Sequence, residues 1–163
     1  MPRLVAERLT PDHFDELFRM HQDARTMANL GGVRDEVKTR EYLAKNLAHW
    51  AEWGYGVWVV RETASPEIIG RACVRHLLLD GIDEIEIGYA FYPAYWRKGY
   101  ATEVALACAE IGLNQLGWNS VVAVTSTANV GSQRVMAKAG MIYERDLLFG
   151  GIPHVLFRRR RAP

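Results

Sequence analysis

Hydrophobic and polar residues alternate in the middle of the chain, from Glu84 to Phe91. The large apolar side chains there occupy every second position: Ile85, Ile87, Tyr89 and Phe91. A period of two, rich in β-branched and aromatic residues, is typical of a β-strand. Pro93 lacks a backbone donor, so strand pairing should stop near it. Apolar residues then recur with helical spacing and predict a helix from about Tyr100 to Leu116.

The chain before this strand alternates between the two kinds of pattern. Thr10 and Pro11 suit the N-cap and the first position of a helix, and a longer helix is expected over residues 35–53 with Gly54 as its C-cap. Short strands are predicted at residues 4–9, 57–61 and 68–78. Asp80-Gly81 begins the turn into the central strand, which suggests hairpins feeding an antiparallel sheet.

The second half of the chain predicts a strand–helix–strand unit, because a buried strand at residues 120–125 follows the helix. A unit of this size implies a parallel strand pair joined by a right-handed crossover. Asn129 is a good N-cap for a further short helix that ends at Gly140. The last two strands are expected at residues 141–149 and 153–158.

The turn between the central strand and its helix carries two cations and a glycine, in the sequence Arg97-Lys98-Gly99-Tyr100-Ala101-Thr102. The first N–H groups of a helix lack intrahelical partners and lie at its positive end, which favours phosphate groups. Gly99 has no Cβ to hold a ligand away from the backbone, and Arg97 and Lys98 add charge. The turn therefore predicts an anion site. An ordinary turn with a solvated basic pair is the alternative for this stretch alone.

Composition narrows the class of protein. The 163 residues are 49% hydrophobic and 24% charged, which predicts one globular domain over residues 1–163. A net charge of +1 argues against a general nucleic-acid binder. The run Arg158–Arg161 is the exception, and we expect a solvated chain end there.

Cysteine, histidine and hydropathy patterns restrict the chemistry further. Cys73 and Cys108 form no Cys-x-x-Cys pair, which argues against a zinc ribbon or a disulfide framework and suits a reducing compartment. The histidines lack metal-ligand spacing, and no apolar run has the length needed to span a bilayer. We therefore expect a cytoplasmic protein without a metal.

The turn and its surroundings resemble the acetyl-CoA pyrophosphate loop of the GNAT N-acetyltransferases. Their pattern is Gln/Arg-x-x-Gly-x-Gly/Ala; Gly99 and Ala101 match it, while Trp96 stands where Gln or Arg is usual. That departure resembles the RimJ/RimL branch, which often carries Trp-Gly-Lys-Gly-Tyr-Ala-Thr-Glu; Arg97 replaces the first glycine of that string. The likeness covers nearly the whole chain, residues 7–141.

This resemblance implies an α/β (α+β) fold: a seven-stranded, mixed, mostly antiparallel sheet with helices on both faces and a V-shaped opening at the central strands. It also implies acetyl-CoA as co-substrate and direct attack by a primary amine in a ternary complex. The acceptor in the RimJ/RimL branch is the N-terminal amine of a ribosomal protein. A small-molecule amine of the antibiotic, polyamine or amino-acid type is the alternative, and homodimer formation is left open.

The same resemblance implies the residues that hold the coenzyme. Main-chain groups of Tyr89, Ala90 and Phe91 would hold the acetyl and pantetheine portion. The pyrophosphate would lie on the turn that comprises Arg97, Lys98, Gly99, Tyr100, Ala101 and Thr102. Asn129 would bind a pantetheine amide, with the helix N-cap as its alternative role.

Two residues are candidates for proton transfer. An α-amine has a pKa of about 7.7–8.0 and a lysine of about 10.4, so a weak base acting through water suffices for an N-terminal acceptor. Glu86 is the candidate base, with a solvated or ion-paired carboxylate as the alternative. Ser132, in the Asn-x-x-Ser pattern of the branch, is the candidate donor to the leaving thiolate, or else an ordinary residue of a first helical turn. Many GNAT enzymes have a tyrosine where Met136 stands, and methionine cannot donate a proton.

A second class of function also fits these features. A coenzyme-binding module without catalysis would use the same turn and would bind acetyl-CoA without turnover on any amine. Release of free thiol in the presence of amines separates the two classes.

Overall fold

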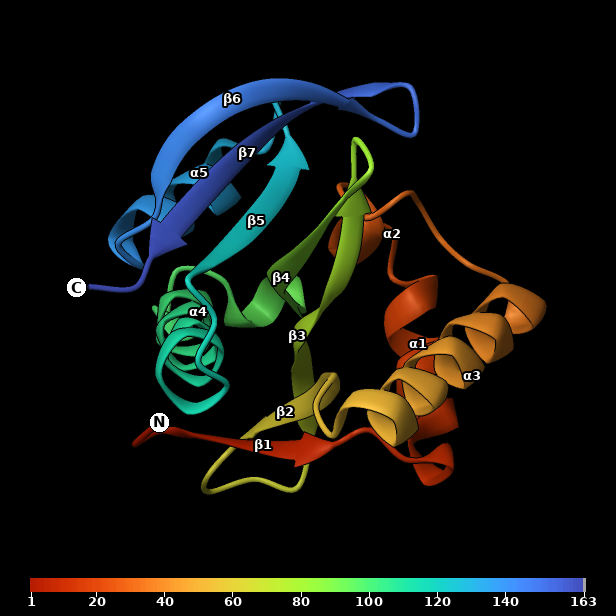
Figure 1. The fold of residues 1–163 in the computed structure, drawn as a ribbon. Coiled ribbons are helices and arrows are strands. Elements are labelled where there is room, and N and C mark those ends of the chain that lie inside the picture. The colour runs from red at the N-terminus through yellow and green to blue at the C-terminus, as the bar shows by residue number, and fades with distance from the viewer. Residues whose placement is uncertain (163) are drawn as a thin grey trace. The chain divides into compact units, whose positions relative to one another are not determined.

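Seven strands form one sheet, in the order β1-β2-β3-β4-β5-β7-β6, in the computed structural model, which describes residues 1–162 (Figure 1). The strands are β1 (Leu4–Arg8), β2 (Val57–Glu62), β3 (Ile68–Leu79), β4 (Ile82–Phe91), β5 (Ser120–Ser126), β6 (Ile142–Phe149) and β7 (Ile152–Arg160). The β4–β5 pair is parallel, whereas β1–β2, β2–β3, β5–β7 and β6–β7 are antiparallel. This confirms the predicted mixed, mostly antiparallel sheet.

Helices occupy the connections between these strands. The α-helices are α1 (Phe14–Gln22), α2 (Ala24–Met27), α3 (Glu36–Trp53), α4 (Tyr100–Glu110) and α5 (Val130–Lys138), with 3-10 helices η1 (Pro11–His13) and η2 (Pro93–Tyr95). Asp35 accepts a hydrogen bond from Lys38 N at 2.8 Å, and Gly54 ends α3 with a left-handed φ of 73°. An acidic N-cap and a glycine after the last turn are common at helix ends, and both explain why α3 has the predicted bounds.

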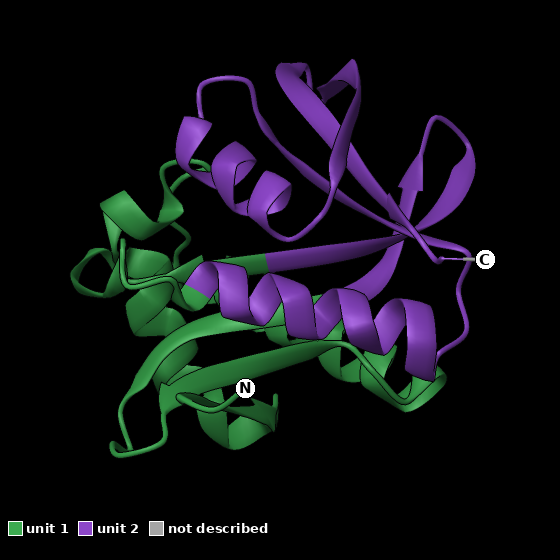
Figure 2. Cartoon of the chain, turned by 90° about the vertical axis from the view of Figure 1, so that its left-hand side faces the viewer, with its two compact units in different colours: residues 1–73, 89–100 green, residues 74–88, 101–163 purple. Residues whose placement is uncertain are grey.

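The chain divides into two compact units (Figure 2). The first comprises residues 1–73 and 89–100, and the second comprises residues 74–88 and 101–163. Strands β3 and β4 therefore each contribute to both units. The expectation of one domain over residues 1–163 stays a prediction.

The first unit has a core between α1, α3 and the strands β2 and β3. Its buried side chains are Leu9, Leu17, Leu43, Val57, Val59 and Cys73. Val57 of β2 is the register partner of Cys73 of β3, so both strands contribute to the same cluster. Burial of these apolar side chains contributes about 25 cal/mol per Å² and stabilises the helices against the strands.

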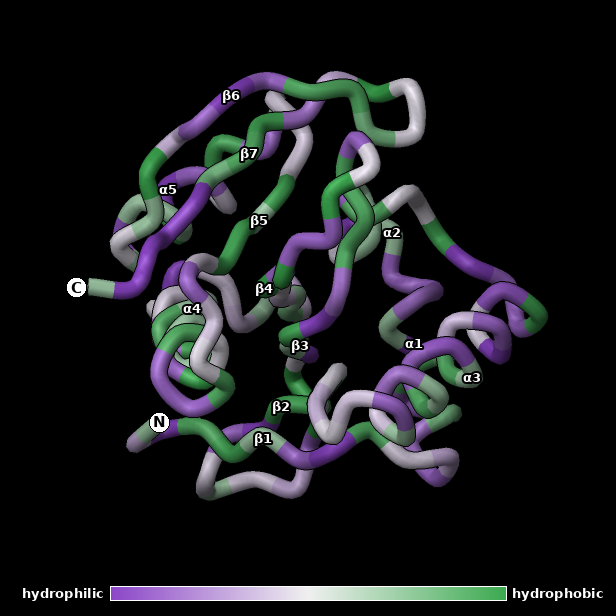
Figure 3. The backbone as a smooth tube through the Cα atoms, in the orientation of Figure 1, coloured by the Kyte–Doolittle hydropathy of each residue, from purple (hydrophilic) through white to green (hydrophobic). Residues whose placement is uncertain are grey.

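The second unit is built around β5. Val121, Val122 and Ala123 are fully or almost fully buried, and Figure 3 shows this part of β5 as hydrophobic. Val122 also belongs to a cluster with Leu79 and Leu156. Both faces of the strand are covered, which explains its continuous apolar run.

The predicted helix over residues 100–116 is only partly α-helical. The α-helix ends at Glu110, and residues Ile111–Gln115 form the π-helix η3. An ideal Cβ on Gly112 would lie 2.6 Å from Cγ1 of Val121, so the missing side chain lets this turn pack directly against β5. Apolar spacing does not distinguish a short π-helix from an α-helix, because the apolar face of the helix continues through both.

The expectation of a solvated end at Arg158–Arg161 is wrong for Arg158 and Arg159, which are half-buried, and holds for the exposed Arg160 and Arg161. Arg158 lies in β7, and its guanidinium contacts Glu84 of β4 at 2.6 Å and Glu144 of β6 at 2.6 Å. Arg159 Nη1 donates to Ala139 O at 3.1 Å, and Arg161 Nη1 donates to Gly117 O at 3.0 Å. The carboxylates that pair with Arg158 are distant in sequence, so the charge run alone could not reveal them.

Within residues 1–162, no helix is long and apolar enough to cross a bilayer. The same residues contain no group of three or more His, Cys, Asp or Glu side chains placed to hold a metal ion.

Candidate active site

Strand β4 and the turn that follows it form a hydrogen-bonded bend in the first unit. Tyr92 N donates to Ile69 O at 3.1 Å just after β4 ends. Pro93 opens the 3-10 turn η2, which confirms that the ladder stops there. The Trp96 indole Nε1 donates to Phe91 O at 2.7 Å and ties the loop back to the strand. Trp96 therefore shapes the bend, which is a role its departure from the usual Gln/Arg did not reveal.

The loop after Trp96 contains two left-handed residues. Arg97 has a φ of 63° and Gly99 a φ of 82°, on either side of Lys98. Among residues 1–162, the main-chain amides of Arg97, Lys98 and Gly99 donate to no backbone carbonyl. Successive amides in a loop of this kind can converge on an anion. The helix α4 begins directly afterwards, at Tyr100.

Three cations lie at this loop, of which the sequence indicated two. Arg97 and Lys98 are exposed. Arg3 Nη1 donates to Lys98 O at 3.0 Å, and the Arg3 guanidinium lies 4.7 Å from the centroid of the Tyr100 ring. Tyr100 OH in turn donates to a carboxylate oxygen of Glu62. Arg3 lies 95 residues from Lys98, so no local sequence signal could have linked it to the loop.

The end of β4 approaches β3 very closely. Ala90 and Phe91 are buried and Tyr89 is half-buried. An ideal Cβ on Gly70 would lie 2.4 Å from Cδ1 of Phe91 and 2.5 Å from the Ala90 carbonyl oxygen. Only a glycine at position 70 permits this packing. The three β4 residues expected to hold the acetyl and pantetheine portion are thus held firmly by the neighbouring strand.

Glu86 lies on β4 within the second unit. Its side chain is 11% exposed, and Arg75 Nε donates to its Oε2 at 2.6 Å. Glu86 is also the residue at which β4 pairs with β5, through Val122, and within that unit this is the one register pair of the two strands. The geometry shows an ion-paired carboxylate; its role as a base stays a prediction.

Asn129 and Ser132 meet at the start of α5. Asn129 Oδ1 accepts from Ser132 N at 3.1 Å, and Asn129 Nδ2 donates to Thr125 Oγ1 at 3.0 Å. Asn129 is therefore the N-cap of α5, as expected. Met136, on the same helix, is 2% exposed and carries no proton to donate. The contacts of Asn129 and Ser132 with a coenzyme stay predictions.

A cluster of His21, Arg34, Tyr42 and Arg71 in the first unit was not predicted; we refer to it as the arginine–tyrosine cluster. The guanidinium carbons of Arg34 and Arg71 each lie 5.0 Å from the centroid of the Tyr42 ring. Arg71 Nη1 donates to Tyr42 OH at 2.6 Å. Its members come from α1, the loop before α3, α3 itself and β3, so only the fold brings them together.

His21 reports the electrostatics of this cluster. Burial, followed by the charges of Arg71 and Arg34, lowers the pKa of His21 from 6.5 to about 3. Its Nδ1 lies 2.9 Å from Thr39 Oγ1 and its Nε2 lies 3.5 Å from Arg34 Nη1. Arginine can only donate, so Nε2 is the acceptor and Nδ1 carries the proton. His21 is therefore neutral beside two guanidinium groups.

The acetyltransferase (GNAT) domain family matches residues 3–142. The chain belongs to this family. It is an acetyl-CoA-dependent N-acetyltransferase, and its seven-stranded mixed sheet is the GNAT fold.

Individual proteins resemble this GNAT chain over most of its length. The uncharacterized protein YkkB of Bacillus subtilis is 27% identical over 141 residues, 86% of this chain and 82% of YkkB. An acetyltransferase structure from Agrobacterium tumefaciens has a TM-score of 0.84 and 23% identity, covering 98% of this chain and 91% of that one.

Two further solved structures share the fold and differ in their acceptors. RimL, a ribosomal α-N-protein acetyltransferase in complex with coenzyme A, has a TM-score of 0.80 and 13% identity, covering 99% of this chain and 96% of RimL. An aminoglycoside acetyltransferase in complex with coenzyme A has a TM-score of 0.77 and 18% identity, covering 97% of this chain and 95% of that one.

Proposed function

We propose that this GNAT enzyme acetylates the N-terminal α-amine of a protein, in the manner of the RimJ/RimL branch. The observation that carries the coenzyme half of this proposal is the loop from Trp96 to Tyr100. It has two left-handed residues, amides that donate to no backbone carbonyl within residues 1–162, and the cations of Arg3, Arg97 and Lys98. The string Trp96–Glu103, with tryptophan at its start, favours the RimJ/RimL branch.

The loop has the chemistry that a pyrophosphate needs. A Cβ at Gly99 would meet only the Arg3 side chain, at 3.4 Å, so a ligand can approach the backbone closely. Arg97, Lys98 and Gly99 would bind phosphate oxygens, and the first residues of α4, Tyr100, Ala101 and Thr102, would add helix-terminal amides. Bound acetyl-CoA would supply an acetyl group activated as a thioester. Main-chain groups of Tyr89, Ala90 and Phe91 would orient it.

Glu86 would accept the proton of the attacking amine through a water molecule at its carboxylate. Arg75 fixes the orientation of that carboxylate through the 2.6 Å contact. The α-amine needs little help, because its pKa of about 7.7–8.0 leaves a neutral fraction near pH 7. A lysine acceptor, at about 10.4, would require a stronger arrangement than a carboxylate tied to arginine.

Ser132 would donate a hydrogen bond from its hydroxyl to the leaving sulfur. The N-cap contact from Asn129 positions Ser132 in the first turn of α5. Asn129 would use its remaining hydrogen-bonding capacity for a pantetheine amide. Cys73 and Cys108 are buried and form no disulfide, which suits a reducing compartment, so we propose that the reaction takes place in the cytoplasm.

Substitution of the loop glycine tests the coenzyme assignment. Gly99→Glu should abolish acetyl-CoA binding in isothermal titration, because a carboxylate would repel the diphosphate and fill its place. Gly54→Glu is the matched control: Gly54 also has a left-handed φ, of 73°, with nothing within 4 Å of an added Cβ. The control should share the backbone strain and keep its coenzyme affinity. Unchanged affinity in Gly99→Glu would show that the loop does not bind the coenzyme.

Thiol release in the presence of different amines tests the acceptor. We expect faster turnover with N-terminal peptides than with polyamines or aminoglycosides. A small-molecule acceptor is the second candidate, favoured by the aminoglycoside acetyltransferase with the same fold. Acetyl-CoA binding without thiol release on any amine would instead identify a non-catalytic binding module.

A further inference from the structure

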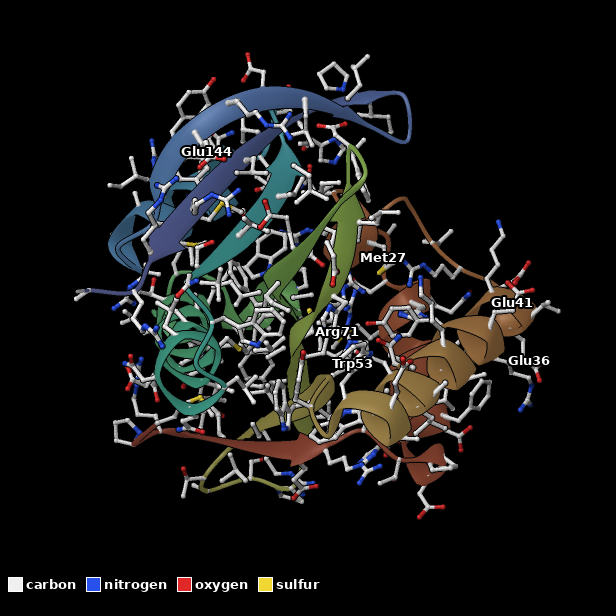
Figure 4. The ribbon with its side chains drawn as sticks, viewed as in Figure 1. Met27, Glu36, Glu41, Trp53, Arg71 and Glu144 are labelled. Atoms are coloured by element: carbon white, nitrogen blue, oxygen red, sulfur yellow. The ribbon has the colours of Figure 1, made fainter. Side chains whose placement is uncertain are left out.

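Arg71 is a buried arginine without an anionic partner. Its side chain projects from β3 beside α3, where Tyr42 lies (Figure 4). The residue is only 7% exposed, and its Nε is buried without any hydrogen-bond partner. Among the ion pairs of residues 1–162, none includes Arg71. Buried arginines are usually paired, because removal of an unpaired charge from water costs several kcal/mol.

Two other arginines of the chain pair with carboxylates, as buried arginines usually do. Arg75 pairs with Glu86, and Arg158 pairs with both Glu84 and Glu144. Arg71 instead uses one nitrogen, Nη1, for the neutral Tyr42 hydroxyl and leaves Nε unsatisfied. The Nε side of a guanidinium is one at which a carboxylate can accept two parallel hydrogen bonds.

The surroundings of Arg71 add positive charge. Arg34 lies on the same tyrosine ring, and the charges that lower the pKa of the neighbouring His21 are those of Arg71 and Arg34. Arg34 and Tyr42 are half-buried, so the arginine–tyrosine cluster extends from the interior to the surface. Two further unsatisfied polar atoms, Thr26 Oγ1 and Nε of Arg61, are buried in the same unit, although Arg61, unlike Arg71, pairs with Glu7.

The cluster also lies next to the strand end that is proposed to orient the acetyl group. Arg71 directly follows Gly70, at which a Cβ would lie 2.5 Å from the Ala90 carbonyl oxygen. The backbone from which Arg71 projects is therefore packed against Ala90 and Phe91. A carboxylate bound at Arg71 would therefore be held by the strand that borders this segment.

We propose that the arginine–tyrosine cluster binds a carboxylate of the amine acceptor, so that the substrates are amines that also carry a carboxylate. This inference rests on the proposed acetyl transfer to an amine and specifies its substrate class. Arg71 is the principal ligand through its guanidinium, whose buried Nε has no hydrogen-bond partner within residues 1–162, and the half-buried Arg34 adds charge. The carboxylate belongs either to a free amino acid or to an acidic residue in an N-terminal peptide.

Matched acceptor pairs test the proposal. One arm compares L-amino acids with their amides, and the other compares peptides that begin with Asp or Glu with peptides that begin with Asn or Gln. The carboxylate forms should have the higher kcat/KM by about 10- to 100-fold, the usual worth of a hydrogen-bonded charge pair. The pKa effect works against the expected preference. A nearby carboxylate raises the pKa of the amine, so a smaller fraction of the acid form carries a neutral amine that can attack. Equal kcat/KM values for acids and amides would overturn the proposal. So would a result in which O-phosphoethanolamine, an amine that carries a phosphate in place of a carboxylate, is the one acceptor that is acetylated.

Substitution of Arg71 locates the effect. Arg71→Gln should remove the preference for the acid in each pair while acetyl-CoA affinity stays unchanged by isothermal titration. Arg40→Gln is the control, because Arg40 lies on α3 but pairs with Glu36 at the surface. A preference for acids that persists in Arg71→Gln would assign the carboxylate site elsewhere.

The thermal stability of an Arg71 variant distinguishes a binding role of this residue from a structural one. Arg71→Met keeps the volume and removes the unpaired buried charge, so Tm without substrate should rise by about 2 °C or more. A fall in Tm would identify Arg71 as a structural support of Tyr42. If no amine at all is acetylated, the proposed function fails, but the carboxylate site can still be tested by titrating N-acetylglycine into the wild type and into Arg71→Gln. Binding to the wild type that is lost in Arg71→Gln supports the site. Absence of binding to the wild type overturns it.

Discussion

His21 shows how one buried side chain senses charges from other elements. It is fully buried on α1, and the guanidiniums of Arg71 on β3 and Arg34 before α3 act on it along with burial. All three effects disfavour the imidazolium, so the pKa falls to about 3. The residue is a neutral hydrogen-bonding group at the pH of the cell rather than a proton carrier.

The low pKa of His21 predicts a pH-dependent stability. Above about pH 6.5 His21 is neutral in both folded and unfolded chains and has no effect. Below that value the unfolded chain takes up a proton that the folded chain refuses, so stability falls by up to about 1.4 kcal/mol per pH unit as the pH drops toward 3. The free energy of unfolding, measured with urea, should be lower at pH 5 than at pH 7. His21→Asn should reduce this difference by about 1–2 kcal/mol.

The asparagine variant keeps a donor near Thr39, so it removes the titration rather than the hydrogen bond. His154→Asn is the control, because its Nδ1 contacts the Ile152 carbonyl at an exposed position. Identical pH dependence in wild type and His21→Asn would mean that His21 becomes protonated in the folded protein.

The end of α4 shows how an element is decided by what it packs against. The apolar pattern continues to residue 116, but the α-helix gives way to the π-helix η3 at Ile111. Gly112 faces Val121 of β5 at a distance that leaves no room for a methyl group. The close approach of η3 to β5 depends on this glycine.

Gly112→Ala should therefore destabilise the protein by about 1–3 kcal/mol, because the new methyl group overpacks the contact with Val121. Gly131→Ala, in the first turn of α5, is the matched control. Its Cβ would meet nothing nearer than Asn129 Oδ1 at 3.6 Å, so the change should be neutral or stabilise by about 0.4–1 kcal/mol. Thermal and urea unfolding of both variants measure the difference. Equal effects would show that helix propensity, and not packing, governs both sites.

At the scale of the whole molecule, the charge near the C-terminus stabilises the sheet. Arg158 of β7 donates to Glu84 of β4, Glu144 of β6 and Ser120 Oγ of β5 (Figure 4 labels Glu144). One guanidinium thus links four strands of the second unit. The pKa of Glu144 is lowered, chiefly by its hydrogen bond to Arg158.

Arg158→Gln should reduce the free energy of unfolding by about 3–5 kcal/mol, since it removes the arginine that pairs with Glu84, whose side chain is 15% exposed, and leaves Glu144 with Arg160 alone. Arg160→Gln should cost less than about 1 kcal/mol, because that side chain is 70% exposed. Urea unfolding at pH 7 provides the comparison. Similar losses in the two variants would contradict a special role for Arg158.

Much of the fold was open to prediction from local physics. Asp35 and Gly54 mark the ends of α3, Pro93 ends the β4 ladder, and Asp80-Gly81 has the two positive φ angles of a tight hairpin turn. The Gly99 loop could be located for the same reason: its function depends on consecutive residues. Roles that depend on single side chains, such as Glu86 and Ser132, stay predictions, because their chemistry depends on what surrounds them.

The sequence by itself determined the strands, most of the helices and the position of the Gly99 loop, since backbone preferences and apolar periods act between residues a few positions apart. Only the tertiary structure decided that Arg3 joins Lys98, that Arg158 joins Glu84, and that Nε of Arg71 has no hydrogen-bond partner within residues 1–162. These pairings depend on distances between residues remote in the chain. An apolar period can be read from the sequence, whereas the partner of a charged residue is known only once the fold shows which residues lie beside it.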